Sequence, residues 1–391
     1  MIDFDEAARL TLDLARPLGS ERVPVVDAAG RILAEPLTAR GDAPRAAVSA
    51  MDGYAIRTST ATRLRVIGQS FPGAGFPGEV AEGEAVRIFT GAPLPAGADR
   101  VVIQEVVRRE GDVAMLDQPP SGPAHVRAQG SDFRAGSLLL EAGRRLDARA
   151  MVAAGGADRS EVEVWRCPKV VVLGTGDELL APGTAHLTPF GIPESVSLGV
   201  AALAEAWGGT CIGRQRLSDD LASLKEAARE ALDQADVVVV TGGASVGERD
   251  FARAMFEDCG LDLVFSKVEM KPGKPVWLGR ALGRLVLGLP GNPTSAMVTA
   301  RLFLAPLMAG LSGRAPEAAW RWRHAALTAP VAETGDRETF QRGRSEGDGV
   351  EPFTDQDSGS QLILARSDLL IRRRPFQPAA KAGDSVEVLD F

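Results

Sequence analysis

The chain has 391 residues, of which 45% are hydrophobic and 25% are charged, and its formal net charge is −8 at pH 7. A length of this order predicts roughly two to four domains, and the composition is that of a soluble globular protein. The acidic balance argues against a general nucleic-acid-binding protein, which needs a basic face, whereas a few local lysines are enough to bind an anionic small molecule.

Cysteine and histidine are too few and too scattered to form a disulfide framework, a zinc site or a histidine-based catalytic triad. They are Cys167, Cys211, Cys259, His125, His186 and His324. An odd number of cysteines without a C-x-x-C pair is typical of a reducing cytosol. The N-terminus carries acids where a signal peptide is basic, and residues 285–313 are interrupted by glycine, proline and arginine. We therefore expect a cytoplasmic protein without a membrane span.

The first part of the chain predicts a helix followed by short strands. Leu10, Leu14 and Leu18 recur at helical spacing, which predicts an amphipathic helix at the N-terminus. From about 41 to 135, short β-like runs such as RLRVIGQS and EAVRIFT are separated by glycine and proline, which predicts a compact, mostly β module. Residues 137–166 return to helix and short strand, and we expect them to rejoin the N-terminal segment.

The pattern changes at Pro168. From there to about 312, apolar strands such as KVVVLG and DVVVV alternate with helical stretches such as DDLASLKEAAREALDQ. This alternation predicts a parallel sheet covered by helices on both faces, and the short β-like runs that follow predict a small β module. The predicted domains are 1–40 together with 136–166, then 41–135, 167–312 and 313–391.

Three apolar strands of this segment end in glycine turns: KVVVLGTGDE (169–178), DVVVVTGG (236–243) and RLVLGLPGNP (284–293). The C-terminal ends of parallel strands share one edge of a sheet, and ligands of open α/β sheets bind outside that edge. Glycine permits close backbone approach, and the exposed N–H groups suit phosphate oxygens. One such turn is an ordinary connection, but three that converge predict a ligand site. None of them is a Walker loop.

The third turn also predicts the start of a helix. Asn292 is suited to the N-cap and Pro293 to the first helical position. A helix that begins there would direct its free N–H groups at the same ligand.

Charged side chains of both signs cluster in the sequence around this predicted edge. They are Asp177, Glu178, Asp219, Glu248, Asp250, Lys267, Lys271 and Lys274. A polyanion and a divalent cation bound together would account for such a mixture. Each acid has a plainer alternative as a helix cap or a solvated charge, and for Asp219 the cap is as well supported as a functional role. The alternative for the lysines of KPGKP is a basic surface turn.

Six motifs, in order along the chain, resemble the molybdopterin molybdenumtransferase (MoeA-like) family, which includes the E domain of gephyrin. They are SAMDGYAIR (49–57), TGAPLPAGADRVVIQE (90–105), GTGDEL, VTGGASVGERDF, KVEMKPGKPVWLG and LGLPGNPTSAM. The resemblance implies a multidomain α/β plus β fold. A doubly wound parallel-sheet domain, similar to the stand-alone molybdopterin adenylyltransferase (MoaB/Mog-like), is accompanied by an elongated N-terminal helix/strand region. An inserted mostly-β domain and a small C-terminal β-barrel-like domain complete this fold.

The resemblance also implies an activity. Family members insert molybdenum from molybdate into adenylylated molybdopterin and release AMP, and they require Mg²⁺. They form homodimers, in which one subunit's β domain lies beside the other's α/β domain. A transient contact with a molybdopterin adenylyltransferase is a further implied partnership, and neither nucleic acid nor membrane is an expected partner.

Functional residues follow from the turns and from the family motifs. The catalytic residues expected are Asp250, Asp219, Glu178, Asp52 and Thr90, the first three also as metal ligands. The residues expected to bind substrate or anion are Gly242, Gly243, Ser245, Lys267, Lys271, Lys274, Gly291, Asn292, Ser295, Asp132 and Arg342. Asp52, Thr90 and Asp132 rest on the resemblance alone, because by themselves they indicate only turns and a strand end. The alternative for Arg342 is a surface arginine.

The chain departs from the family pattern at two places. Glu194-Ser195-Val196 stands where the family has an Asp-Ser/Thr-Asn run, so a pterin contact or a helix-start contact is expected to differ. Leu362-Ile363 stands where the family has a small polar pair, so a hydroxyl contact to molybdate is expected to be missing. These changes leave open a paralogue with altered substrate handling.

Two alternative functions remain at this stage. One is adenylylation of molybdopterin with ATP, against which SAMDGYA, TGAPLP and the additional domains argue. The other is a non-catalytic, gephyrin-like scaffold, against which the clustered acids and lysines argue.

Overall fold

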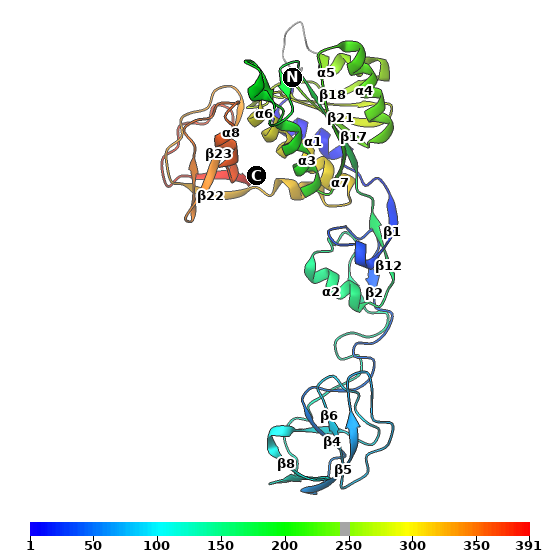
Figure 1. The fold of residues 1–391 in the computed structure, drawn as a ribbon. Helices are drawn as coiled ribbons and strands as arrows, with labels where there is room; N and C mark the ends of the chain where they lie inside the picture. The colour runs from blue at the N-terminus through cyan, green and yellow to red at the C-terminus, as the bar shows by residue number, and fades with distance from the viewer. Residues whose placement is uncertain (243–250) are drawn as a thin grey trace. The chain divides into compact units, whose positions relative to one another are not determined.

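The computed structural model describes residues 1–242 and 251–391, and the chain forms two compact units (Figure 1). The larger unit comprises Met1–Arg22, Gly30–Ala34 and Glu163–Phe391, and the smaller unit comprises Val23–Ala29 and Glu35–Val162. The finer division into the domains 1–40 with 136–166, 41–135, 167–312 and 313–391 stays a prediction.

A mixed sheet forms the centre of the larger unit. In spatial order its strands are β16 (Thr210–Leu217), β13 (Lys169–Thr175), β17 (Val237–Thr241), β21 (Arg284–Leu289), β20 (Trp277–Ala281) and β18 (Asp262–Phe265). The first four are parallel to one another, whereas β20 is antiparallel to both of its neighbours. The three strands predicted from their glycine turns are therefore adjacent in space.

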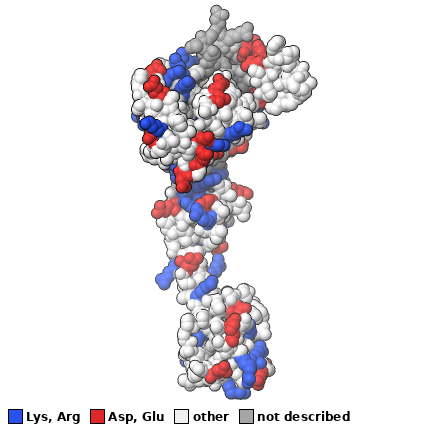
Figure 2. Space-filling view, turned by 90° about the vertical axis from the view of Figure 1, so that its left-hand side faces the viewer, with Lys and Arg blue, Asp and Glu red and all other residues white. Residues whose placement is uncertain are grey.

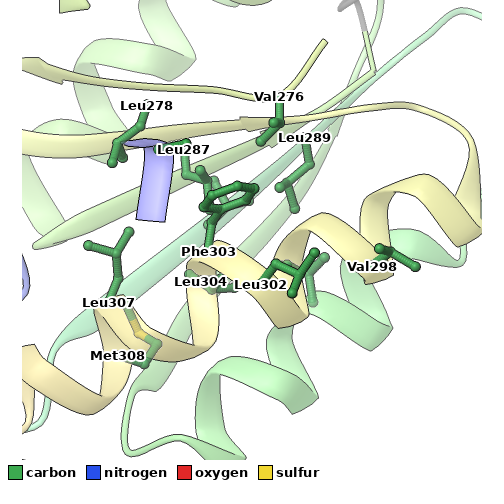
Figure 3. Close-up of a cluster of buried hydrophobic side chains, with 14 of the residues drawn as sticks. Val276, Leu278, Leu287, Leu289, Val298, Leu302, Phe303, Leu304, Leu307 and Met308 are labelled. Carbon is green, nitrogen blue, oxygen red and sulfur yellow. The ribbon is translucent and has the colours of Figure 1, made fainter. Parts of the chain in front are cut away.

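Helices cover both faces of this sheet, as predicted. On one face lie α1 (Phe4–Leu14), α3 (Val196–Ala206), α6 (Pro293–Thr299) and α7 (Ala305–Leu311). On the other lie α4 (Leu221–Gln234) and the short α5 (Phe251–Ala254). Alternate residues of β13 serve the two cores, because Val170 and Val172 belong to the first and Val171 and Leu173 to the second. Figure 3 shows Phe303 of the first core packed between the sheet and the helix that contains α6 and α7.

The predicted N-terminal helix is confirmed as α1, but it ends at Leu14, so Leu18 lies beyond it. Asp3 caps it by accepting a hydrogen bond from the Glu6 N–H at 2.7 Å. Its buried face carries Phe4, and Leu10 and Leu14 pack against the first core. Burial of this face stabilises a helix that would be marginal alone at this length.

Residues Pro293–Leu311 form one continuous helix, although the sequence predicted a stretch broken by proline. The chain becomes π-helical over Ala300–Leu304, and Pro306 follows in the first turn of α7, where a missing N–H is tolerated. This helix is long and apolar enough to cross a membrane, but 94% of the apolar window lies buried inside the protein. Such burial is that of a core helix.

The C-terminal β module is a closed barrel. Its strands are β22 (Arg323–Leu327), β23 (Glu338–Glu346), β24 (Gly349–Pro352), β25 (Leu369–Arg373) and β26 (Ser385–Asp390). The pairing runs β23-β24-β22-β26-β25 and closes from β25 back to β23. The short strand β19 (Met270–Lys271) pairs in parallel with the start of β23, so the KPGKP segment is attached to the barrel.

The smaller unit is mostly β, as predicted. Its main sheet has the order β7 (Arg100–Ile103), β4 (Gly53–Ile56), β6 (Glu84–Ile88), β5 (Arg63–Ser70), β9 (Val113–Leu116) and β8 (Val107–Glu110). Two short pairs accompany it: β3 (Val48–Ser49) with β10 (Val126–Arg127), and β2 (Leu37–Thr38) with β11 (Leu138–Leu140). The helix α2 (Ala148–Gly156) follows. The predicted return of residues 137–166 to the N-terminal segment is confirmed by β2 with β11 and by β1 (Ser20–Pro24) with β12 (Glu161–Trp165).

Charged side chains on the protein surface are mixed in sign. Figure 2 shows lysine and arginine interspersed with aspartate and glutamate on the face in view.

Candidate functional site

A cavity of about 530 Å³ lies at the carboxyl-terminal edge of the parallel strands. All three glycine turns line it. Their contributions are Thr175, Gly176, Thr241, Gly242, Gly291 and Asn292. The expectation that the three turns converge on one pocket is therefore confirmed for the described residues.

Glycine is required where the turns touch. Gly242 has a φ of +90°, and a Cβ added to it would lie 2.4 Å from the carbonyl oxygen of Thr175. A Cβ on Gly291 would lie 3.3 Å from the Cα of Gly242. Larger residues at these positions would force the turns apart and occupy the cavity.

The described lining of the cavity is acidic. Its charged residues are Glu178, Glu194 and Asp219, and no lysine or arginine is among the described lining residues. Lys267, Lys271 and Lys274 therefore do not line this cavity. Gly243, Ser245, Glu248 and Asp250 lie outside the described residues. An acidic lining suits a cation or a ligand rich in N–H donors better than a bare phosphate.

The helix-cap interpretation of Asp219 is wrong. The N-cap of α4 is Asp220, whose carboxylate accepts hydrogen bonds from the N–H and hydroxyl of Ser223 at 2.9 and 2.7 Å. These bonds lower the pKa of Asp220. Asp219 instead lines the cavity, and its backbone N–H donates to the carboxylate of Asp177 at 3.0 Å. Asp220 therefore caps the helix, and its neighbour Asp219 faces the cavity.

Only two of the three predicted metal ligands lie among the described residues. Glu178 and Asp219 both line the cavity, and Asp250 is outside the described residues. Among the described residues, no group of three histidine, cysteine, aspartate or glutamate side chains is arranged to hold a metal ion. Carboxylate oxygens are nevertheless the protein ligands that Mg²⁺ prefers, often one or two per ion, so the donor set present fits that ion.

The KPGKP segment packs between helix α6 and the barrel. Gly273 has a φ of +104°, and a Cβ there would lie 2.2 Å from the Thr299 side chain in α6. On the other side, Lys271 pairs with Thr339 in β23. The side chains of Lys271 and Lys274 are exposed, and that of Lys267 is partly buried. The backbone of this segment is therefore fixed, while two of its lysine ammonium groups stay accessible.

Arg342 in β23 is a buried cation whose guanidinium makes no hydrogen bond within the described part of the chain. Its exposed fraction is 0%, and none of its three guanidinium nitrogens has a hydrogen-bond partner among the described residues. Burial lowers the pKa of Arg342, against the opposing effect of Asp355 and Asp357. The alternative of an exposed surface arginine is excluded. A buried guanidinium that makes no hydrogen bond is costly, so Arg342 stays a candidate for binding an anion.

The loop 353–361 connects Arg342 with the cavity. Gln356 bonds to the Arg342 backbone in both directions, as it accepts from the N–H at 2.9 Å and donates to the carbonyl at 3.0 Å. Further along the loop, Ser358 accepts a hydrogen bond from the Asn292 amide at 2.9 Å through its hydroxyl and from the Thr294 N–H at 3.1 Å through its carbonyl. The loop ends near Gln361, which lines the cavity.

The contacts of this loop at the start of α6 differ from those that the sequence predicted. Asn292 occupies the N-cap position of α6, but its side chain makes no capping bond. The N–H of Thr294, expected to be free for a ligand, is instead occupied by Ser358. Ser295, in the same first turn, is 5% exposed. At the second departure from the family pattern, Leu362 in α8 (Gln361–Ala365) is exposed.

In the smaller unit, Asp52 and Thr90 are hydrogen-bonded to each other. The Asp52 carboxylate accepts from the Thr90 N–H at 2.7 Å and from its hydroxyl at 2.9 Å. These two bonds, the backbone one first, lower the pKa of Asp52, and Arg87 contributes in the same direction. Asp132 is exposed in a separate loop, where its N–H donates to Ala43.

Sequence reasoning missed Glu194 and Gln361 as cavity residues. Glu194 was noted only as a departure from the family pattern. Its position two residues before a helix was the available signal, because an acid there suits the helix N-terminus. For Gln361 no local pattern was available, since it reaches the cavity from the C-terminal barrel region.

Comparisons with known proteins agree over the whole chain. Family models described as the MoeA N-terminal region (domain I and II), a probable molybdopterin binding domain and the MoeA C-terminal region (domain IV) match residues 2–156, 171–310 and 324–391. The chain is 34% identical over 406 residues to the molybdopterin molybdenumtransferase of Haemophilus influenzae, covering 100% of this chain and 99% of that protein. It is 34% identical over 319 residues to that of Bacillus subtilis, covering 78% and 74%.

A crystal structure of the molybdopterin biosynthesis MoeA protein from Pyrococcus horikosii is similar at 30% identity, with a TM-score of 0.83 and coverage of 100% and 99%. The chain belongs to the molybdopterin molybdenumtransferase (MoeA) family. The resemblance carried by the six motifs and the multidomain MoeA fold are therefore confirmed. The protein is a transferase of molybdenum cofactor biosynthesis.

In this MoeA protein, we expect Thr90→Val to raise the pKa of Asp52 while leaving it below its ordinary value of 3.8. The hydroxyl bond is lost, but the stronger effect of the backbone N–H remains. Because the folded-state pKa lies below the unfolded one, these bonds stabilise the fold above the unfolded-state pKa. Their contribution is lost as the pH falls through the folded-state pKa. NMR titration of the labelled carboxyl carbons measures this shift.

Thr58→Val is the matched control for this prediction. Its hydroxyl and N–H bond to Asp99 in the same way, at 2.7 and 2.9 Å. This variant leaves the Asp52 titration unchanged. An Asp52 pKa that does not move in Thr90→Val would show that the hydroxyl bond does not act on the carboxylate in solution.

Proposed function

We propose that this protein inserts molybdenum from molybdate into adenylylated molybdopterin and releases AMP. The observation that carries the proposal is the pairing of an acidic cavity at the sheet edge with Arg342 in the adjoining barrel, a buried cation whose guanidinium has no hydrogen-bond partner among the residues that the structure describes. A loop whose hydrogen bonds reach both Arg342 and the start of α6 links the two. One region suits a metal ion with the organic part of the substrate, and the other suits an oxyanion.

In the cavity, backbone N–H groups are proposed to bind the phosphates of the substrate, and carboxylates are proposed to bind the metal ion. The turns at Gly242 and Gly291 bring backbone close to the ligand, where N–H groups can bind the phosphates. Glu178 and Asp219, together with Asp250 from the second turn, would hold Mg²⁺. When bound, the ion would neutralise negative charge on the phosphate from which AMP departs. These residues thereby orient the substrate, and no side-chain nucleophile is needed.

The molybdate oxyanion is proposed to bind to residues in the barrel and in the segment that pairs with it. Arg342 provides a desolvated guanidinium for molybdate, and Lys271 and Lys274 provide accessible ammonium groups in a segment fixed against β23. Lys267 and Ser295 are proposed to complete the anion contacts. Asp52, Thr90 and Asp132 are proposed as polar contacts to the substrate from the smaller unit. A cytoplasmic homodimer is proposed from the family, as is a transient contact with a molybdopterin adenylyltransferase.

The alternative of an adenylyltransferase that uses ATP is less well supported. Family models match the chain outside the molybdopterin-binding segment, at residues 2–156 and 324–391. An enzyme that acts only through the α/β module needs neither region. A non-catalytic scaffold does not explain why the Arg342 guanidinium is buried without a hydrogen bond to a described residue.

We expect Arg342→Gln to raise the KM for molybdate in AMP release by about 10- to 100-fold, the effect of a lost hydrogen bond to a charged group. The KM for adenylylated molybdopterin stays close to that of the wild type. Thermal stability without ligand does not fall, because the variant removes a buried charge whose guanidinium has no hydrogen bond to a described residue. Steady-state AMP release at varied molybdate concentration measures the effect.

The control for this variant is Arg344→Gln on the same strand. Arg344 is exposed and paired with Glu351 at 2.5 Å, so its loss leaves the molybdate KM unchanged. A molybdate KM that is unaffected by Arg342→Gln would remove this arginine from the oxyanion site.

We expect Glu178→Gln to raise the Mg²⁺ concentration for half-maximal AMP release by at least about tenfold, because one anionic ligand is lost. In the wild type, EDTA abolishes AMP release and added Mg²⁺ restores it. Glu226→Gln, an exposed acid on α4, is the control without effect. An unchanged Mg²⁺ requirement in Glu178→Gln would place the ion elsewhere.

A further inference from the structure

We propose that the stacked rings of Phe71 and Phe89 in the smaller unit bind a planar, amino-substituted heteroaromatic ring of the substrate. The inference rests on the proposed function, which it extends to two residues outside the six family motifs. Adenylylated molybdopterin carries two rings of this kind, the adenine and the pterin, and the experiment below distinguishes them.

The two phenyl rings lie face to face. Their centroids are 4.8 Å apart and their planes differ by 12°. Phe89 is partly buried and Phe71 is 44% exposed, and neither ring belongs to the two hydrophobic clusters described for the main sheet of this unit. Because Phe89 covers one face of Phe71, the exposed area of Phe71 lies on its other face and on its edge. A further planar ring can therefore stack on this outer face.

Arg87 in β6 supports the inner ring of this pair. Its guanidinium carbon lies 4.8 Å from the centroid of the Phe89 ring and 5.2 Å from that of Tyr54, its register partner in β4. The guanidinium donates hydrogen bonds to the Gly53 carbonyl oxygen at 2.9 Å and to the Gln104 side-chain oxygen at 2.5 Å. These bonds fix the orientation of the guanidinium, so the two phenyl rings rest on a fixed support.

A tight turn fixes the backbone of the outer ring. The N–H of Phe71 donates to the Ala74 carbonyl, and the N–H of Ala74 donates to the Phe71 carbonyl, both at 3.0 Å. Pro72 and Gly73 occupy the two central positions, and Gly73 has a φ of +78° that glycine adopts readily. A residue that is ordered before the ligand arrives loses less conformational entropy on binding.

A carboxylate oxygen near the stack is available to a ligand. Both hydrogen bonds from Thr90 reach the same oxygen of Asp52, Oδ1, and Oδ2 accepts none from the described residues. Thr90 directly follows Phe89, and the charge of Arg87 acts on the Asp52 carboxylate, so this acceptor lies close to the stack. An acceptor suits the amino group that adenine and pterin both carry.

The test measures the binding of AMP, ribose 5-phosphate and 6-hydroxymethylpterin to the full-length protein by isothermal titration calorimetry. Stacking of adenine predicts that Phe71→Ala weakens AMP binding about 10- to 100-fold. Binding of ribose 5-phosphate, which lacks the ring, stays unchanged. Stacking of the pterin predicts the same loss for 6-hydroxymethylpterin. Either result supports the inference and identifies the ring.

Two further variants separate stacking from a structural role. Phe71→Trp keeps the affinity that Phe71→Ala loses, because a larger aromatic ring also stacks. Phe376→Ala removes an exposed phenyl ring from the loop between β25 and β26 and leaves all three affinities unchanged. A merely structural role of Phe71 would lower thermal stability in Phe71→Ala without changing the binding of AMP or the pterin.

Unchanged affinities for both AMP and the pterin in Phe71→Ala overturn the inference, as does a Phe71→Trp variant that binds as weakly as Phe71→Ala. Molybdate-dependent AMP release by the wild type, measured on the same preparations with adenylylated molybdopterin and Mg²⁺, reports on the proposed function separately. Release by the wild type together with unchanged affinities in Phe71→Ala would discard the role of the stack and leave the transferase function standing.

Discussion

The close approach of the turns after β13, β17 and β21 is the constraint on which the site depends. A Cβ on Gly242 would lie 2.4 Å from the Thr175 carbonyl oxygen, and one on Gly291 would lie 3.3 Å from the Gly242 Cα, so the turns approach this closely because neither residue has a side chain. The valine-rich strands hold these turns in register deep in the protein, so their ends cannot separate without cost to the core. The cavity is what remains at this edge when three turns meet without side chains between them.

A second constraint joins this cavity to the C-terminal barrel. The strand β19 pairs with β23 next to the KPGKP segment, and the loop 353–361 bonds to the start of α6. In β25, which pairs with β23, the Arg372 side chain is 5% exposed and forms ion pairs with Glu338 and with Asp5 of α1. The N-terminal helix, the sheet edge and the barrel therefore pack together, and Arg342 lies on β23, the strand that pairs with β19, β24 and β25.

The pattern of hydrophobic residues predicted the elements that bury apolar faces. The amphipathic spacing of Leu10 and Leu14 predicted α1, and the valine runs predicted adjacent parallel strands whose turns converge. The effect of proline on the helix at 293–311 was not predicted correctly. Pro306 was interpreted as a break, but tertiary burial maintains the helix through a π-helical turn that no local preference signals.

The chemistry of the site was less predictable than its location. Residue type showed that acids and lysines gather near the turns, but it did not show which of Asp219 and Asp220 caps the helix. Nor did it show that the lysines lie outside the acidic lining. The burial of Arg342 and the position of Glu194 in the cavity lining depend on contacts between residues far apart in sequence, and short-range patterns carry no information on them. Asp52 and Thr90 were available only from the family resemblance.

Hydrogen–deuterium exchange with adenylylated molybdopterin and Mg²⁺, in the absence of molybdate, tests the central claim most directly. The account predicts joint protection of the backbone at 172–180, 238–242 and 288–296, with no change at the opposite ends of the same strands, at 233–237 and 283–286. Protection of only one of these turns, or protection that is confined to other parts of the chain, would contradict a single ligand site built where the three strands end.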